Sequence, residues 1–225
     1  VTPQGEALLH SRLVGRFNLY NILGAVAAAI ALELPLSAII SGIAGHTAVP
    51  GRLERVESDS GISVFVDYAH TGDALENVLT TISEFAHQRV ITLFGCGGDR
   101  DRGKRPVMAA IAGRLSDLTI ITSDNPRTEE PEAIIAEVRS GILPLALREY
   151  SADQLSDTFT DKGFITITDR QQAIQAAIRV AHPGDIVLLA GKGHEDYQII
   201  GTVKHHFDDR EEAAAALRSH QGSGN

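Results

Sequence analysis

The chain has 225 residues, of which 43% are hydrophobic and 22% charged, and its formal net charge is −9. This composition is typical of a globular protein, and an acidic chain offers no overall basic field to nucleic acid or to an anionic membrane. The only cysteine, Cys96, excludes an intramolecular disulfide and fits a reducing compartment.

The first 50 residues predict two helices and a joint. An Ala-rich helix is expected over 19–34 and a second over 35–45, ending at a Gly45 cap, before the Pro/Gly-containing joint "TAVPGRLE". The apolar run in this part is too short to span a bilayer, and no charged-then-apolar leader precedes it, so we expect a cytoplasmic protein. Two helices cannot form a core alone, and we interpret residues 1–48 as the end of a larger domain rather than as an appendage.

From residue 49 to 219, short apolar strands alternate with helical segments. The predicted strands are 62–67, 90–94, 118–122, 164–168 and 185–191. The predicted helices are 73–87, 106–115, 131–140, 169–181 and 209–218. Strands that are apolar on both faces indicate a mostly parallel sheet covered by helices, which is a doubly wound α/β fold. A late hairpin is expected around Gly201, and residues 220–225 are expected to form a disordered tail.

Polar and glycine-rich segments follow four of the predicted strands. They are "DYAH" after the first, "GCGGDRDRGKRP" after the second, "SDNPR" after the third and "GKGHE" after the last. Ligands of open parallel sheets bind beyond the carboxyl ends of the strands. Any one of these segments is compatible with a solvated loop, but all four together predict a ligand site.

The segment 98–105, "GDRDRGKR", matches the spacing of a phosphate-binding P-loop but not its chemistry. Arg105 stands where a P-loop needs Ser or Thr to bind Mg²⁺, and Pro106 removes an amide donor. We therefore reject a P-loop here and expect the glycines to make a tight turn from which Arg100, Arg102, Lys104 and Arg105 reach outward. A dinucleotide site is equally unsupported, because no strand leads through G-x-G-x-x-G into a helix.

The charged groups at these strand ends suit a zwitterionic ligand. Arginine pairs with a carboxylate through two parallel hydrogen bonds, and aspartate or glutamate pairs with an ammonium group. Arg100 and Arg127 together with Asp124 and Glu195 therefore predict binding of an amino acid. The alternative is that these four residues pair with each other as surface salt bridges, which contribute little to stability.

Taken in order, "GRFNLYN", "PGRLE", "VDYAHTGDALE", "FGCGGDRDRGKRP", "DNPRTEEP" and "GKGHEDYQ" closely resemble the carboxyl-terminal part of the Mur ligases. The resemblance runs from about residue 12 to 218. It implies a Rossmann-like carboxyl-terminal domain over 49–219, preceded at 1–48 by the last helices of a central ATPase domain. In this family "DNPR" marks the members that use meso-diaminopimelate, the third residue of the peptidoglycan stem peptide.

The resemblance also assigns individual residues. By motif, the diaminopimelate-binding positions are Arg100, Asp124, Asn125, Pro126, Arg127, Gly191 and Glu195. The positions implied for ATP are Asn18, Asn21, Arg52, Asp67 and His70. Without the resemblance, helix capping would be the preferred interpretation of Asn18 and Asn21.

In the family, ATP and Mg²⁺ activate the D-glutamate carboxylate of UDP-MurNAc-L-Ala-D-Glu as an acyl phosphate, which the diaminopimelate amine then attacks. The P-loop, the Mg²⁺-binding acid and the domain for the UDP-sugar have no counterpart in this sequence, so the chain alone is expected to be inactive. No catalytic residue and no metal ligand is predicted within it. Two alternatives remain open: a lysine-adding or folylpolyglutamate-type ligase, and an amino-acid-binding module that lacks catalysis.

Overall fold

The computed structural model describes residues 2–156 and 158–222. The helices are α1 (Arg16–Ala31), α2 (Leu36–Gly45), α3 (Gly72–Ser83), α4 (Lys104–Leu115), α5 (Pro131–Ile142), α6 (Arg170–Arg179) and α7 (Asp209–Gly222), with a 3₁₀ turn η1 (Leu143–Leu145). The strands are β1 (Glu54–Val56), β2 (Ser63–Asp67), β3 (Val90–Cys96), β4 (Leu118–Ser123), β5 (Arg148–Glu149), β6 (Gly163–Thr166), β7 (Ile186–Ala190), β8 (Tyr197–Ile200) and β9 (Val203–His206).

A seven-stranded sheet of order β1-β2-β7-β3-β4-β6-β5 forms the body of the molecule. All its neighbouring strands are parallel except the edge strand β1, which runs antiparallel to β2. Along the chain, β2, β3, β4 and β6 are followed by β7, which lies between β2 and β3 in the sheet. Open α/β sheets bind ligands beyond the carboxyl ends of the strands at such a reversal of strand order.

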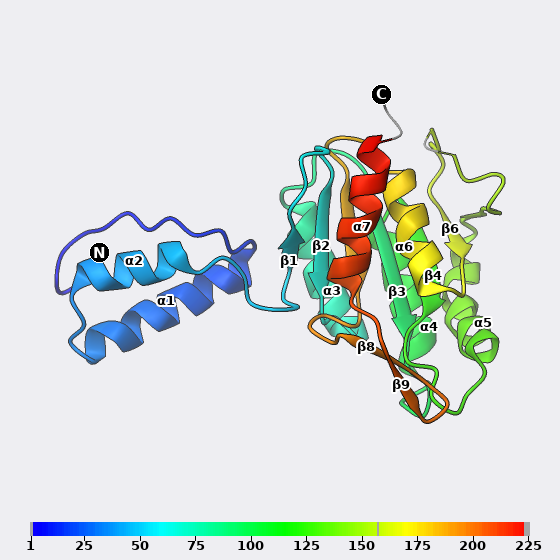
Figure 1. Ribbon diagram of the computed structural model, residues 1–225, viewed down its shortest axis with the longest axis horizontal. Coiled ribbons are helices and arrows are strands. Elements are labelled where there is room, and N and C mark those ends of the chain that lie inside the picture. The colour runs from blue at the N-terminus through cyan, green and yellow to red at the C-terminus, as the bar shows by residue number, and fades with distance from the viewer. Residues whose placement is uncertain (1, 157, 223–225) are drawn as a thin grey trace.

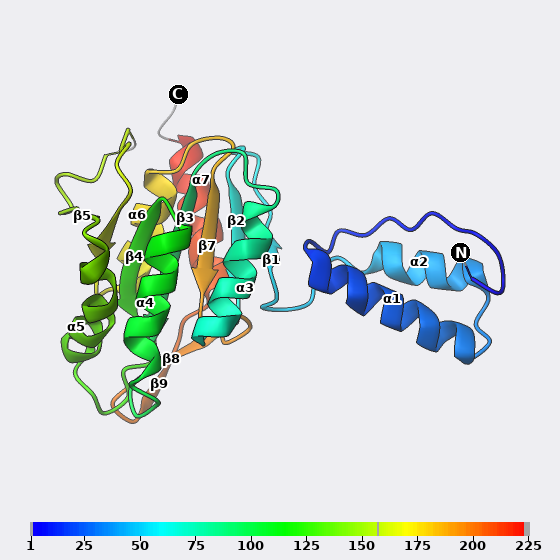
Figure 2. The same cartoon turned by 180° about the vertical axis from the view of Figure 1, so that it is seen from behind.

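Helices cover both faces of the sheet, which confirms the doubly wound α/β fold. Figures 1 and 2 show α6 and α7 on one face and α3, α4 and α5 on the other. Each face has its own apolar core, one built around Phe94 and Met108 and the other around Ile174 and Leu189. Because both faces are buried, β3, β4 and β7 contain no exposed residue, as their nearly continuous apolar runs predicted.

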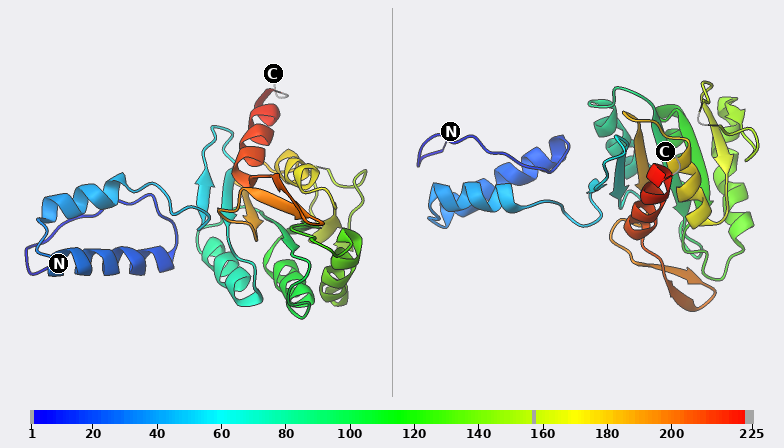
Figure 3. Two further views of the ribbon diagram at one scale, coloured as in Figure 1. Left: turned by 60° about the horizontal axis from the view of Figure 1, so that its bottom comes forward. Right: turned by 45° about the horizontal axis from the view of Figure 1, so that its top comes forward.

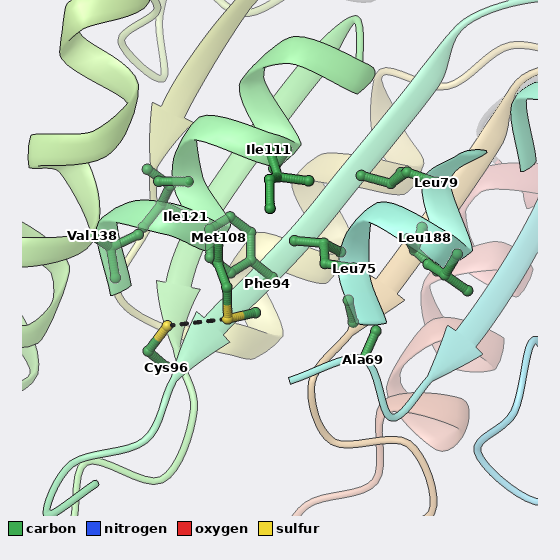
Figure 4. Packing of buried hydrophobic residues seen from close by; sticks show 14 of the residues in the cluster. Ala69, Leu75, Leu79, Phe94, Cys96, Met108, Ile111, Ile121, Val138 and Leu188 are labelled. Atoms are coloured by element: carbon green, nitrogen blue, oxygen red, sulfur yellow. Dashed lines mark hydrogen bonds between the residues drawn. The ribbon is translucent and has the colours of Figure 1, made fainter. Parts of the chain in front are cut away.

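The core beneath α4 includes the single cysteine. Cys96 ends β3 and is buried, and its thiol contacts the sulfur of Met108 at 3.9 Å (Figure 4). Burial raises the pKa of the Cys96 thiol to about 12, so it remains protonated at neutral pH. Cys96 therefore acts as a small apolar side chain that closes the core below the glycine-rich loop.

Helices α1 and α2 lie beside the α/β body and pack mainly on each other (Figure 1). Leu19, Tyr20 and Leu23 on α1 are between 52% and 67% exposed, although they are large apolar side chains. Gly45 does not form the predicted cap: it is the last helical residue, and the capping residue is His46 in an extended conformation. Within the described part of the chain, none of the helices combines the length and the hydrophobicity needed to span a bilayer.

Two edge strands were missed by the sequence analysis. Strands β1 and β5 are three and two residues long, and neither carries an apolar run that would distinguish it from a loop. The hairpin of β8 and β9 was expected, and it turns at Gly201, whose φ of 60° favours glycine. Helix α7 continues to Gly222, so residues 220–222 are helical rather than part of a tail, while residues 223–225 lie outside the described residues.

Candidate functional site

The four polar segments begin at one edge of the sheet. Ala190 of β7 lies opposite Asp67 of β2 on one side and Phe94 of β3 on the other, and Cys96 of β3 lies opposite Ser123 of β4. The loops that follow these strands therefore start side by side. The β8–β9 hairpin crosses this same edge, as the left view of Figure 3 shows. The predicted clustering of the strand ends is confirmed.

The glycine-rich loop after β3 packs directly on the "DNPR" turn after β4. The amide of Gly98 donates to the carbonyl of Asn125 at 2.9 Å, and Nη1 of Arg127 donates to the carbonyl of Gly98 at 2.8 Å. A Cβ on Gly95 would lie 2.6 Å from the carbonyl oxygen of Thr122. Gly95 and Thr122 are paired at the ends of β3 and β4, and glycine is needed here because the two strands approach each other too closely for a side chain.

Asn125 connects three segments of the site. Its side chain is buried, and its Nδ2 donates to Oε2 of Glu195 at 3.0 Å. Its Oδ1 accepts from the backbone amide of Ile199 in the hairpin at 2.9 Å and from Nζ of Lys192 at 3.3 Å. The "DNPR" turn, the "GKGHE" loop and the hairpin are thus joined through one amide group.

Arg127 has a left-handed backbone with φ of 51°, which is uncommon for a residue other than glycine. The hairpin holds this conformation, because the amide of Arg127 donates to the carbonyl of Ile199 and the amide of Gly201 donates to the carbonyl of Arg127. Asp99, in the loop opposite, is also left-handed with φ of 53°. Such strain persists only where the surroundings fix it, and it is concentrated at binding sites.

Gly191 and Pro126 have mainly conformational roles in this arrangement. Gly191 follows β7 with φ of 112°, and its amide donates to the carbonyl of Asp67 at 3.0 Å. Pro126 is buried and lines a neighbouring cavity of about 570 Å³ together with Ser123 and Gln198. Of the seven residues predicted to bind the amino acid, Arg100 is the most peripheral: it is exposed, and its guanidinium contacts the carbonyl of Asp99.

Arg105 does not reach outward as predicted. Its guanidinium is fully buried and pairs with Glu129 and Glu137, and it also donates to the carbonyl of Gly97. The hydrogen bonds from Arg105 lower the pKa of Glu129 to about 2. The position that a P-loop would use for Mg²⁺ thus carries a structural cation, which explains why the "GDRDRGKR" segment cannot bind phosphate in that way.

The predicted charges do not neutralise one another. Among the described residues, neither Arg100 nor Arg127 forms a salt bridge with Asp124 or Glu195, and Asp124 pairs instead with Lys192 at 3.0 Å. Mutual surface salt bridges are therefore not the reason that these four residues share one edge. Lys192 was not predicted as a site residue, although its place between two glycines of "GKGHE" was the signal available.

A second cavity, of about 650 Å³, lies where α1 meets α3 and the joint. It brings together four of the five residues predicted to contact ATP: Asn18, Asn21, Arg52 and Asp67. Phe17 and Val49 add apolar surface to the same cavity. An apolar wall with amide groups and one guanidinium fits a purine base carrying phosphate. His70 is not among the lining residues, and its Nδ1 contacts the carbonyl of Tyr68 at 2.8 Å.

Besides lining this cavity, Asp67 and Asn18 form hydrogen bonds within the chain. Oδ2 of Asp67 accepts from the amide of Leu53 and Oδ1 from the amide of Ala69, and burial raises the pKa of this carboxyl. Asn18 is buried within α1 and donates to the carbonyl of Val14, while the helix begins after Gly15. Neither Asn18 nor Asn21 is a helix cap, so the capping interpretation is wrong.

Residues 51–193 match the family described as "Mur ligase, glutamate ligase domain". Two curated proteins similar to the chain are named UDP-N-acetylmuramoyl-L-alanyl-D-glutamate–2,6-diaminopimelate ligase. The one from Geobacter metallireducens is 66% identical over all of this chain, and the one from Geobacter sulfurreducens is 68% identical over 97% of it. The chain spans 44% and 43% of the length of these two relatives.

Two solved structures of Mur ligases are also similar to this chain. A structure of UDP-N-acetylmuramoyl-L-alanyl-D-glutamate–2,6-diaminopimelate ligase superposes with a TM-score of 0.70 at 39% identity, over 98% of this chain and 42% of that one. UDP-N-acetylmuramate-alanine ligase from Thermotoga maritima superposes with a TM-score of 0.63 over 97% of this chain and 41% of that one. Its identity is only 16%, so this second match supports the fold alone.

Proposed function

Because the chain belongs to the Mur ligase family, we propose that it is the carboxyl-terminal part of a longer ATP-dependent ligase, one that adds meso-diaminopimelate to UDP-MurNAc-L-Ala-D-Glu in peptidoglycan synthesis. The reaction is amide-bond formation, in which the amine attacks a carboxylate activated as an acyl phosphate and releases ADP and phosphate. In this domain organisation, residues 1–48 form the end of the central ATPase domain and residues 49–219 bind the amino acid. The protein works in the cytoplasm.

The observation that carries this proposal is the network around Asn125, which joins the "DNPR" turn to Glu195 of "GKGHE". Asn125 contacts both an arginine and a carboxylate: its backbone carbonyl accepts from Nη1 of Arg127 at 3.4 Å, and its Nδ2 donates to Glu195. A diamino dicarboxylic acid has an ammonium and a carboxylate at its distal end, and the two side chains offer a partner to each. The site then holds the amine for attack, which accelerates the reaction by orientation.

The cavity at α1 supports a share of the ATP site. Arg52 is exposed beside it and suits a phosphate, and Asn21 suits the edge of adenine. Each oxygen of Asp67 accepts one amide hydrogen bond and retains a lone pair for a ribose hydroxyl. The reactive phosphate and Mg²⁺ belong to parts of the ligase outside this chain, so the chain itself positions the nucleotide and the amino acid.

A direct test compares amino-acid substrates in the full-length protein. With ATP, Mg²⁺ and UDP-MurNAc-L-Ala-D-Glu present, we expect ligation of meso-diaminopimelate with a far higher kcat/KM than L-lysine or L-glutamate. Preference for lysine would support the lysine-adding alternative, and preference for glutamate the folylpolyglutamate-type one. Binding of the amino acid without any ligation would favour the non-catalytic module.

A further inference from the structure

The side chain of Lys192 is fully buried, although it carries a charge and lies at the edge of the proposed amino-acid site. Its ammonium group has partners on two segments: in the "DNPR" turn it pairs with Oδ1 of Asp124 at 3.0 Å and donates to Oδ1 of Asn125 at 3.3 Å, and in the hairpin it donates to the carbonyl of Tyr197 at 2.6 Å. A buried lysine is tolerated only when its charge is compensated, and here one carboxylate pairs with the ammonium group while two further oxygens accept hydrogen bonds from it. Lys192 therefore connects the "DNPR" turn to the hairpin.

This contact sets the orientation of the Asn125 side chain. Oδ1 of Asn125 receives hydrogen bonds from Lys192 and from the amide of Ile199, so that Nδ2 faces Glu195. The reversed amide would place an NH₂ group against an ammonium and an N–H, which leaves buried donors without acceptors. The position of Glu195 thus depends on Lys192 through Asn125.

The same lysine makes the two carboxylates of the site electrostatically different. Asp124 is paired with Lys192, whereas no lysine or arginine of the described residues forms a salt bridge with Glu195. The charge of Asp124 is offset within the chain, and that of Glu195 remains available to an ammonium group brought by a ligand. The two acidic residues therefore have unequal roles, although they lie in the same network.

We propose that Lys192 is a positioning residue for the amino-acid substrate: its ammonium group fixes Asn125 and offsets Asp124, which leaves Glu195 as the carboxylate that pairs with the substrate ammonium. This inference rests on the proposed function, because it concerns the same site. Lys192 acts through Asn125 and Asp124 and does not touch the substrate. Its loss should weaken binding of the amino acid and leave binding of ATP at the α1 cavity intact.

The test uses Lys192→Met in the full-length ligase, with Lys162→Met as the matched control. Lys162 donates to the carbonyl of Arg114 in an exposed contact away from the carboxyl ends of the strands. Its replacement should therefore change the KM neither for meso-diaminopimelate nor for ATP. For Lys192→Met we expect the KM for meso-diaminopimelate to rise by about tenfold to a hundredfold, the range for losing a charge-assisted hydrogen bond. The KM for ATP should stay within about twofold of the wild type, a difference well below one hydrogen bond.

Three results would overturn the inference. One is a folded Lys192→Met enzyme with an unchanged KM for the amino acid, and another is an equal rise in the KM values for both substrates. If Lys192→Met does not fold, Lys192→Gln is judged by the same comparison, since its amide can still donate to the Tyr197 carbonyl. The third result is failure of both variants to fold, which would show that Lys192 has only a structural role. A wild-type enzyme that does not use meso-diaminopimelate refutes the proposed function instead, and the comparison is then made with the amino acid it does use.

Discussion

The carbonyl oxygen of Pro126 lies only 1.9 Å from the point where a Cβ on Gly98 would stand. The loop after β3 and the turn after β4 are therefore in backbone contact, with no room for a side chain between them. Arg127 strengthens the contact by donating to the Gly98 carbonyl. The shape of the proposed amino-acid site depends on this approach as much as on its charges.

Replacing Gly98 with alanine should force the two loops apart. Insertion of a methyl group against a fixed backbone typically costs about 1–3 kcal/mol in the free energy of unfolding. Gly24→Ala is the matched control, because a Cβ there meets nothing within 4 Å and Gly24 lies inside α1. Alanine at that position should be neutral or stabilise by up to about 1 kcal/mol. Chemical denaturation of the two variants tests both expectations, and equal effects would contradict the close approach.

The buried ion pair of Arg170 and Asp209 should be sensitive to removal of one partner. Both side chains are fully buried, and Nε and Nη2 of Arg170 donate to the two carboxylate oxygens at 2.8 and 2.6 Å. Asp209→Asn leaves the guanidinium without its counter-charge, and we expect a loss of about 3–5 kcal/mol in the free energy of unfolding.

The exposed pair of Arg148 and Asp161 serves as the comparison, since its side chains are 50% and 60% exposed. Asp161→Asn should change the free energy of unfolding by less than about 1 kcal/mol. A small effect at both pairs in the same denaturation experiment would show that Asp209 is not needed to compensate Arg170.

Acid should weaken the contacts of Glu129, which lies between β4 and α5 and pairs with Arg105 of α4. Its pKa is lowered from 4.5 to about 2 by Arg105, so the stabilisation is present above about pH 4.5 and is lost as the pH falls toward 2. Glu129→Gln removes this titration. We expect the difference in unfolding midpoint between wild type and Glu129→Gln to shrink progressively over that interval. A difference that stays constant from pH 7 to pH 2 would contradict the pairing with Arg105.

Cys96 should be unreactive in the folded protein. It is buried against Met108, and burial raises the pKa of its thiol to about 12, whereas the thiolate is the reactive form. Thiol labelling with an aromatic disulfide reagent at mildly alkaline pH should be slow in buffer and complete in guanidinium chloride. Rapid labelling of the folded chain would show that the core under α4 opens readily.

The sheet was predictable because its central strands are buried on both faces. Residues 90–94 and 118–122 are nearly continuous apolar runs interrupted only by threonine, and each is followed by glycine or polar residues that mark a strand end. The edge strands β1 and β5 were not predictable, since a short exposed strand has no periodic signal and depends on its neighbour for its hydrogen bonds. Position in the sheet, rather than local propensity, decides whether such segments become strands.

The site was predictable in its location and less so in its contacts. Parallel strands align their carboxyl ends, so the segments carrying Asp124 and Glu195 were expected to meet. What the spacing could not indicate was that Lys192 is buried against Asp124, or that Arg105 turns inward to Glu129. Both are long side chains whose direction is set by tertiary acceptors on other segments, and no local pattern encodes those acceptors.

The proposed selection of diaminopimelate by the 124–127 turn is tested most directly by Arg127→Ala in the full-length ligase, scored separately with meso-diaminopimelate and with L-lysine. Loss of a charge-assisted contact to the distal carboxylate should cost about 1.5–3 kcal/mol, which is roughly tenfold to more than a hundredfold in apparent affinity. Arg127→Lys should recover little, because an ammonium group cannot reproduce the planar fork. Lysine lacks that carboxylate, so its use should barely change. An unchanged KM for meso-diaminopimelate, or equal losses for the two amino acids, would contradict the assignment of Arg127 as the specificity residue.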